Sequence, residues 1–322
     1  RDAVAAVYDR IERRVGPDGR AQGEGSLWVS DHSASYHPIR HHYLKATAEA
    51  GLPTGNPALE EGAGPYRTTT RKGWRCSAAD AFLRPALKRP NLKVVTGAEV
   101  MAVTLANGRA TGVRYLRKGR TLTATCRGEI ILAAGAVKSP QILQLSGIGP
   151  GELLRTHAIP VHTDNPGVGG GLQDHLGIDS SFRATEPTLN QILGTWSGNL
   201  RAVLQYVWSR TGPLSIGVNQ MGGLVRSSPE QTRADIQLYF NPLTYSTKYA
   251  NRRPLLRPDP WPGFVLGFNA CRPTSRGRID IASPDPLAAP RIVPNYLSTN
   301  EDIAQAITGG RLIERIMQTT AM

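Results

Sequence analysis

One stretch, residues 128–149, constrains the fold of this chain more than any other. It opens with an apolar run at 130–133, which is typical of a strand buried on both faces in a parallel sheet. Residues 134–136, Ala-Gly-Ala, form a turn with almost no side chains. Ser139 and Pro140 then predict the N-cap and the first turn of a helix. We therefore expect a buried strand, a tight turn and a helix.

A turn of this kind lets another molecule approach the backbone closely. The N–H groups at the start of the helix favour an anionic group such as a pyrophosphate. Gly147 is a helix stop, so the helix is expected to be short. The same residues also suit a plain strand-to-helix turn with no ligand, because any tight turn favours small residues. The residues alone leave both interpretations open.

Composition is that of a globular protein. The 322 residues are enough for two lobes that each have a core. Hydrophobic residues make up 40% of the chain, and none of the apolar runs approaches the roughly 20 residues that span a bilayer, which argues against an integral membrane segment. Cys76, Cys126 and Cys271 lack metal-ligand or disulfide spacing. We expect a cytoplasmic location, and leave membrane association open.

The net charge of +13 raises the question of a nucleic-acid partner. The basic residues are spread along the chain, with no long Lys/Arg run and no strip of interleaved aromatic residues. We therefore expect no nucleic-acid partner.

The pattern along the chain predicts an elaborated α/β protein. Strands are expected at 92–96, 100–105, 110–116, 121–126, 236–240, 263–271 and 278–282. Asn107-Gly108 and Lys118-Gly119 predict tight hairpin turns between the alternating runs. Helices are expected at 3–14, 39–50, 200–210 and 302–317. The strands after residue 178 suit a mainly antiparallel sheet with one face on a core.

The string GAVKSPQILQLSGIG at 135–149 closely resembles the second signature of the glucose–methanol–choline (GMC) oxidoreductases. Four further blocks are similar to that family and occur in its order. They are GWRCSAADAFLRP at 73–85, NLKVVTGAEV at 91–100, NPGVG with LQDH at 165–175, and RPTSRGR with SPDP and PNYL between 272 and 297.

The resemblance implies a fold class and a domain plan. The fold would be α/β (α+β overall), with a Rossmann-like FAD-binding domain interleaved with a mainly antiparallel-sheet substrate domain. Residues 1–90 would form a connecting or lid segment, and 91–177 the FAD-binding segment. Residues 178–271 would form the substrate-binding domain, and 272–322 the start of the C-terminal segment.

The resemblance also implies FAD as the cofactor. In the family pattern the main chain of Val100 meets the adenine, and residues 133–136 support the adenine and ribose side. The cofactor-binding residues expected on this basis are Val100, Ala133, Ala134, Gly135, Ala136, Ser139, Asp174 and His175. The family's usual asparagine before Leu172 is Gly171 here, so no side-chain contact is expected at 171.

The implied activity is that of a choline- or alcohol-dehydrogenase-like enzyme, with a small alcohol as substrate. A CH–OH group would lose its hydride to flavin N5, and a quinone, oxygen or another acceptor would take up the electrons. Tyr239, Phe240, Asn241 and Gln220 are candidates for the alcohol pocket, with ordinary sheet packing as the alternative role. Alternatives for the whole protein are an alcohol oxidase, a hydroxynitrile lyase and a non-catalytic FAD-binding protein.

Two family features are missing from the chain. No Gly-x-Gly-x-x-Gly follows a strand, although that fingerprint carries the FAD pyrophosphate in the family. The family's catalytic histidine would lie beyond Met322, so we expect no catalytic residue here. The simplest expectation is an internal piece of a longer enzyme.

Three other motifs suggest different chemistry. His37 and His41 have the i, i+4 spacing of a zinc pair with His42 beside them, but no third ligand is evident, so no metal site is expected. Ser146 lies in Leu-Ser-Gly-Ile-Gly, which is not the Gly-x-Ser-x-Gly of a nucleophile elbow, so we reject a hydrolase. Asp174-His175 has the composition of a base with an orienting carboxylate, but we place it near the cofactor.

Overall fold

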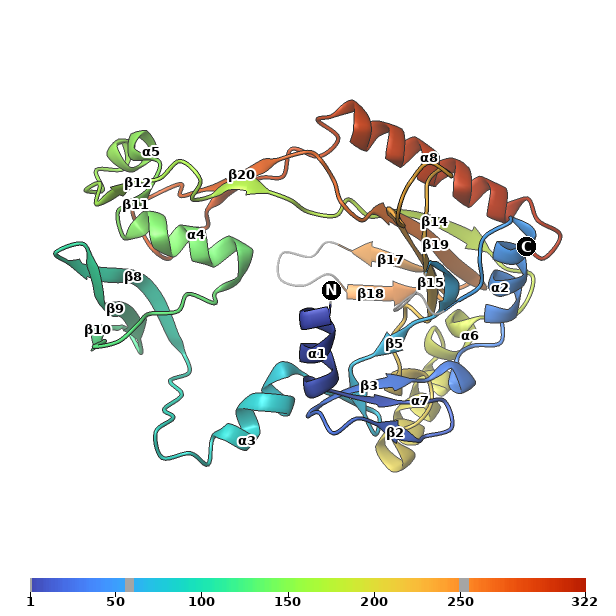
Figure 1. The fold of residues 1–322 in the computed structure, drawn as a ribbon. Coiled ribbons are helices and arrows are strands. Elements are labelled where there is room, and N and C mark those ends of the chain that lie inside the picture. Colours follow the sequence, from blue (N-terminus) through green and yellow to red (C-terminus); the bar gives the residue numbers. More distant parts are fainter. Residues whose placement is uncertain (1, 56–60, 249–254) are drawn as a thin grey trace. The chain divides into compact units, whose positions relative to one another are not determined.

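The computed structural model describes residues 2–55, 61–248 and 255–322 (Figure 1). This part of the chain divides into two compact units, and each unit is assembled from separate segments. Unit 1 contains Arg1–Leu92, Leu176–Arg272 and Ala304–Met322, and unit 2 contains Lys93–His175 and Pro273–Ile303. The chain thus crosses between the units more than once.

The centre of unit 1 is an antiparallel sheet. Its strands are β4 (Gly62–Pro65), β14 (Ile178–Arg183), β15 (Met221–Val225), β16 (Ile236–Asn241) and β19 (Gly263–Ala270). They lie in the order β14-β19-β16-β15-β4, and every neighbouring pair is antiparallel. The strands expected at 236–240 and 263–271 are present, and the expected mainly antiparallel sheet is confirmed.

One face of this sheet carries the core of unit 1. Helices α2 (Arg40–Glu49) and α8 (Asn300–Met317) contribute side chains to that core, together with β15, β16 and β19. Tyr43 of α2 is fully buried and stacks on Phe240, with 5.0 Å between ring centroids. Leu238 and Ile316 are also fully buried, and burial of such a side chain contributes about 1.5–3 kcal/mol. Apolar burial therefore fixes which face of the sheet is internal.

A second, smaller sheet lies in the N-terminal part of unit 1. It contains β1 (Glu12–Val15), β2 (Ala21–Gln22), β3 (Leu27–Asp31) and β5 (Arg67–Thr68), in the order β2-β1-β3-β5. Helix α1 spans Asp2–Ile11, so the helix expected at 3–14 ends early. The reason is that the next four residues pair with β3 as a parallel strand.

The remaining elements of unit 1 are short strands, turns and helices. They are β6 (Thr70–Arg71), β7 (Trp74–Arg75), a π-helical turn (Ala79–Leu83), α3 (Arg84–Ala86), α6 (Leu189–Leu193), α7 (Trp196–Ser209), β17 (Tyr245–Lys248), β18 (Leu255–Pro258) and 3₁₀ turns at Ser33–Ser35 and Pro213–Ser215.

Unit 2 contains an antiparallel meander of three strands. These are β8 (Ala98–Ala106), β9 (Arg109–Arg117) and β10 (Arg120–Thr125). Asn107 and Gly108 join the first pair with φ values of 50° and 73°, and Lys118 and Gly119 join the second with 50° and 72°. Two consecutive positive φ angles define the hairpin turn that Asn-Gly favours. Both predicted hairpins are confirmed.

The rest of unit 2 surrounds helix α4. The further elements are α4 (Gly135–Leu145), β11 (Ile148–Gly149), α5 (Gly151–Thr156), β12 (Thr163–Asp164), β13 (Gly170–Leu172), β20 (Gly277–Asp280) and β21 (Arg291–Val293). The fully buried Gln144 of α4 donates from Nε2 to the Ile279 carbonyl at 3.0 Å and accepts the Ile281 N–H at 2.8 Å. One amide thus ties the segments 93–175 and 273–303 together.

Two predicted strands are wrong. Residues 92–96 and 130–133 are in neither a helix nor a strand, because none of the described strands pairs with either segment. Ile131 was expected to be buried on both faces, but its side chain is 85% exposed. An apolar run becomes a strand only when another strand takes up its hydrogen bonds.

The predicted start of helix α4 is also wrong. The helix begins at Gly135, and Pro140 lies inside it instead of in its first turn. Gly135 has a φ of +79°, which lets the chain turn into the helix four residues before Ser139. Gly147, also with a φ of +79°, ends the helix as predicted.

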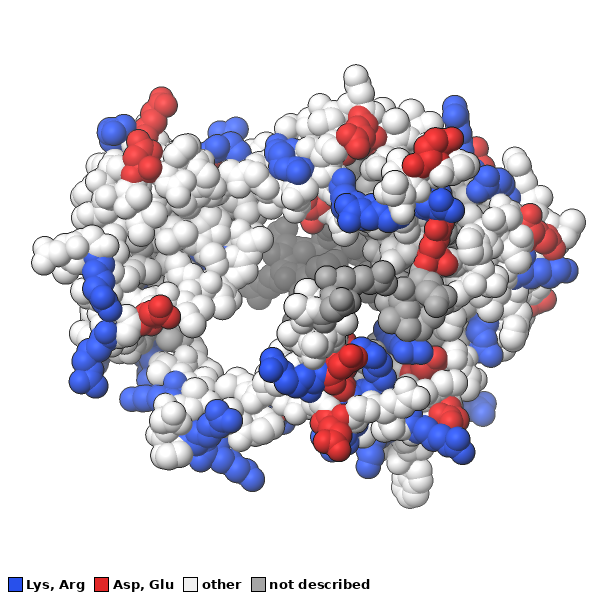
Figure 2. Space-filling view, in the orientation of Figure 1, with Lys and Arg blue, Asp and Glu red and all other residues white. Residues whose placement is uncertain are grey.

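Charged residues are interspersed over the surface. On the face drawn in Figure 2, lysines and arginines lie scattered among acidic and uncharged residues. Arg226 pairs with Glu61 at 2.9 Å, and Arg278 pairs with Asp280 at 3.0 Å. Among the described residues, none of the helices is both long enough and apolar enough to cross a membrane.

Two adjacent glycines of α8 test the packing of the core. A Cβ atom at Gly309 would lie 2.0 Å from Cε2 of Phe268, whereas one at Gly310 would have no atom within 4 Å. We expect Gly309→Ala to destabilise the protein by about 1–3 kcal/mol through overpacking. Gly310→Ala, the matched control, should stabilise it by about 0.5–1 kcal/mol through helix propensity. Urea unfolding midpoints measure both, and a stabilising Gly309→Ala would contradict this packing.

Candidate functional site

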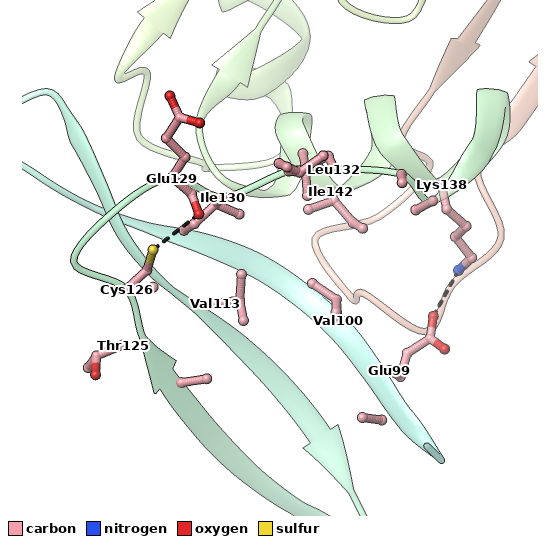
Figure 3. Close-up of a pocket in the computed structure, with 16 residues that line it drawn as sticks. Glu99, Val100, Val113, Thr125, Cys126, Glu129, Ile130, Leu132, Lys138 and Ile142 are labelled. Carbon is pink, nitrogen blue, oxygen red and sulfur yellow. Dashed lines mark hydrogen bonds and ion pairs between the residues drawn. The ribbon is translucent and has the colours of Figure 1, made fainter. Parts of the chain in front are cut away.

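Unit 2 contains a hollow of about 640 Å³. It lies between the meander and the segment that leads into α4 (Figure 3). Its lining residues are Ala98, Glu99, Val100, Gly112, Val113, Ala124, Thr125, Cys126, Glu129, Ile130, Ile131, Leu132, Ala133, Ala134, Lys138 and Ile142.

The hollow is lined mainly by aliphatic side chains, and its lining includes one ion pair and one hydrogen bond. Val100, Ile130 and Ile142 are among the side chains drawn around it in Figure 3. Lys138 Nζ lies 3.2 Å from Glu99 Oε1 and so links α4 to β8. Cys126 Sγ donates a hydrogen bond to the Glu129 carbonyl at 3.2 Å. Small and aliphatic side chains leave room for a flat apolar group between the sheet and the chain.

The N-terminus of α4 directly follows this lining. Residues 133–137 are exposed, and a Cβ at Gly135 would have no atom within 4 Å. The first N–H groups of a helix have no partner within it and carry part of the positive end of the helix dipole. An anionic group can therefore approach the backbone at Gly135 without meeting a side chain.

The predicted cofactor residues separate into two groups. Val100, Ala133 and Ala134 line the hollow, and Gly135 and Ala136 follow in the first turn of α4. The Oγ atom of Ser139, one turn further on, accepts the N–H of Ala134 at 3.2 Å, so Ser139 holds the turn instead of capping the helix.

Asp174 and His175 belong to unit 2 but do not line this hollow. Both are exposed, and the Tyr296 hydroxyl donates to Oδ2 of Asp174. The backbone N–H of His175 donates to Asp174 Oδ1 at 3.0 Å. The structure thus gives Asp174 a local structural role that the sequence alone did not indicate.

Ser146 has a structural role at the end of α4. Its buried hydroxyl donates to the Ile142 carbonyl at 2.6 Å and accepts the N–H of Val103, in β8, at 2.8 Å. Both hydroxyl functions are therefore used between the helix and the meander.

Unit 1 contains a second hollow, of about 520 Å³. Its ten lining residues all carry a polar group. They are Tyr66, Arg67, Thr68, Asp179, Asn219, Gln237, Tyr239, Asn241, Tyr245 and Asn269. We call this set the polar face.

The polar face lies on the side of the sheet opposite the core. Along β16, the core side chains of Ile236, Leu238 and Phe240 alternate with Gln237, Tyr239 and Asn241. Successive side chains of a strand point to opposite faces, so the pairing that builds the core also builds the polar face.

A glycine makes room for the largest side chain of the polar face. Gly267 of β19 stands opposite Tyr239, and a Cβ there would lie 2.3 Å from Tyr239 Cε2 and 2.3 Å from Asp179 Oδ1. The Tyr239 ring therefore rests across the backbone of the neighbouring strand, which no other residue type at 267 would allow.

The phenols of the polar face are held by the main chain. Tyr239 donates to the Phe268 carbonyl at 3.1 Å, and Tyr66 donates to the Leu238 carbonyl at 2.5 Å. Burial, with Asp179 nearby, raises the pKa of Tyr239, and burial raises the pKa of Tyr66. Both hydroxyls therefore stay protonated at neutral pH.

Two of the four predicted pocket residues line the polar face. Tyr239 and Asn241 do so, whereas Phe240 lies in the core. Gln220 is buried, and its Oε1 accepts the backbone N–H of His37 at 2.8 Å. Sequence reasoning missed Gln237, although the alternation in Ile-Gln-Leu-Tyr-Phe-Asn at 236–241 could have indicated it.

The histidines singled out in the sequence have other surroundings. His37 precedes α2, so it does not share a helical face with His41. Burial lowers the pKa of His37. His42 contacts the Ala321 carbonyl at 2.9 Å and Glu186 at 3.4 Å. Within the described ranges, no three His, Cys, Asp or Glu residues gather as metal ligands would.

Comparison with known proteins gives consistent matches. Two family models, both described as GMC oxidoreductase, match residues 1–177 and 273–321. An oxygen-dependent choline dehydrogenase of Pseudomonas putida (strain KT2440) is 35% identical over 316 residues, which are 96% of this chain and 55% of that protein. An alcohol dehydrogenase (acceptor) of Pseudomonas putida is 35% identical over 325 residues, 98% of this chain and 58% of that protein. The chain spans a little over half the length of these relatives.

Solved structures share the fold. Pyridoxine 4-oxidase from Mesorbium loti superposes with a TM-score of 0.82 at 24% identity, covering 99% of this chain and 59% of that one. An FAD-dependent oxidoreductase from Chaetomium thermophilum gives a TM-score of 0.83 at 20% identity, covering 100% and 64%. The expected fold class, mixed α/β with antiparallel sheets of the GMC type, is confirmed.

The double hydrogen bond of Ser146 predicts a stability effect. Ser146→Ala leaves the buried Val103 N–H without its acceptor, so we expect a loss of about 1–3 kcal/mol in unfolding free energy. Ser139→Ala is the control in the same helix, because its Oγ accepts one longer bond at the exposed Ala134. Chemical denaturation compares the two, and an equal loss in both variants would contradict the role of Ser146.

Proposed function

The chain belongs to the GMC oxidoreductase family, and on that basis we propose that it forms part of an FAD-dependent enzyme that oxidises an alcohol CH–OH group. The observation that carries this proposal is the hollow of unit 2, where Val100 and residues 133–134 meet beside the exposed N-terminus of α4. The named relatives are dehydrogenases, which favours alcohol oxidation over a hydroxynitrile lyase or a non-catalytic role.

The residues of this hollow fit the chemistry of FAD. The aliphatic lining suits a flat adenine ring, and the start of α4 suits a pyrophosphate. The open space at Gly135 allows close approach to the backbone. In this proposal the main chain of Val100 and residues 133–136 hold the adenine and ribose side. Ser139 supports the turn, and Asp174 and His175 lie on the flavin side.

FAD, when bound, supplies the two-electron chemistry of the oxidation. The chain's own residues bind the cofactor and the alcohol and orient them. Unit 2 positions the cofactor, and the polar face of unit 1 holds the alcohol. Several fixed hydrogen-bonding groups restrict the orientations of a bound alcohol, which lowers the entropic part of the barrier. We propose oxygen or a quinone as the electron acceptor.

The turn at Gly135 supplies the test of cofactor binding. An L residue at a φ of +79° is strained by about 1–2 kcal/mol, and Gly135→Ala therefore displaces the first turn of α4. In the natural full-length protein we expect the flavin bound per polypeptide to fall severalfold, measured from the visible absorption spectrum.

Gly119→Ala is the matched control for this variant. Gly119 lies in a hairpin turn of the same unit with a φ of +72°, and a Cβ there also has no atom within 4 Å. The backbone strain is thus the same, but the residue does not line the hollow. Unchanged flavin content in Gly135→Ala, or an equal fall in Gly119→Ala, would contradict the proposed site.

A further inference from the structure

We propose that the polar face of unit 1 binds a neutral, polyhydroxylated alcohol, and that Asn241 Oδ1 accepts a hydrogen bond from one of its hydroxyl groups. This inference deepens the proposed function and rests on it, because that function assigns the alcohol to the polar face. It is carried by a buried amide oxygen that has no hydrogen-bond partner among the described residues, by the uniform polarity of the lining and by the absence of a carboxylate cluster from its ten residues.

Asn241 has an acceptor that the fold does not use. The residue is 5% exposed, and within the described chain its Oδ1 has no hydrogen-bond partner. A buried acceptor without a donor costs about 1–3 kcal/mol. A ligand that donates to this atom removes that cost. A hydroxyl group suits the position because it can donate to the amide oxygen of Asn241 and can also accept from the amide NH₂ group.

The lining of the polar face matches a ligand with several hydroxyl groups. Four of its residues are carboxamides, namely Asn219, Gln237, Asn241 and Asn269. Each carboxamide offers donors and an acceptor, and three tyrosines and Thr68 add hydroxyl groups. Some of these groups are already paired within the fold, but a long apolar alcohol would offer no hydrogen bond to those that are not, such as Asn241 Oδ1, which disfavours its binding.

The same lining is poorly suited to a quaternary ammonium group. Recognition of such a cation depends on open aromatic faces or an excess of negative charge. The lining contains one acidic side chain, Asp179, and one basic side chain, Arg67, which itself pairs with Asp31 at 3.9 Å. The ten lining residues thus include one charge of each sign and no cluster of carboxylates. The Tyr239 ring has one face against Gly267, and its hydroxyl is held by a main-chain carbonyl. A neutral ligand is therefore favoured over choline.

Substrate preference tests the class of ligand. The natural full-length protein, loaded with FAD, is mixed anaerobically with sorbitol, glycerol, choline, benzyl alcohol or octanol, and flavin reduction is followed by absorbance. We expect kcat/KM for a polyol to exceed that for choline by at least about tenfold, a difference of about 1.4 kcal/mol. Preference for choline or for an apolar alcohol would overturn the inference and leave the proposed function intact. Reduction by none of the alcohols would instead overturn the proposed function.

Direct binding tests the role of Asn241 without flavin chemistry. Calorimetric titration of the same protein with the preferred polyol gives its Kd. Asn241→Leu keeps the approximate size but removes the acceptor, and we expect Kd to rise about tenfold. The control is Asn199→Leu, an equivalent change at an exposed residue of α7 that is not part of the polar face. Unchanged affinity in Asn241→Leu would overturn the inference.

A second variant keeps the test decisive if Asn241→Leu does not fold. Gln237 lies on the same strand and the same face but is only half-buried, and its Nε2 donates to the Tyr66 hydroxyl at 3.3 Å. Gln237→Leu removes one further amide from the lining, so weaker polyol binding is again expected. Unchanged or tighter polyol binding in Gln237→Leu would overturn the inference.

Discussion

The pairing of β16 with β19 fixes both faces of unit 1 at once. Leu238 stands opposite Phe268, and Tyr239 stands opposite Gly267. The first pair lies in the core and the second on the polar face. A slip of one residue would place carboxamides and a tyrosine in the core and apolar side chains on the polar face. Burial of the apolar side chains therefore holds the polar groups in place.

Unit 2 depends on a different constraint, the junction between α4 and the meander. Ser146 joins the end of the helix to β8, and Gly135 sets the angle at which the chain enters the helix. Between them the helix carries Lys138 and Ile142 to the hollow. The chain thus places an exposed helix N-terminus beside an aliphatic lining, which is the arrangement that the proposed cofactor site requires.

Sequence reasoning succeeded where structure is set locally. Asn107-Gly108 and Gly147 determine turns through their own φ angles, so both could be predicted from the sequence. The strand predicted at 130–133 was wrong because a strand needs a partner, and no described strand supplies one. The polar face was only partly predicted. Its residues come from distant segments, and an unpartnered atom such as Asn241 Oδ1 becomes visible only after those segments have paired.

A double-mutant cycle measures whether Asn241 forms a hydrogen bond with a substrate hydroxyl group. The cycle compares kcat/KM of the full-length enzyme and its Asn241→Leu variant for the best polyol and for each of its monodeoxy analogues. We predict that the wild type discriminates against one analogue by about tenfold, and that the variant loses this discrimination, because the bond contributes about 1–1.5 kcal/mol. The same discrimination in both proteins for every analogue would contradict the account.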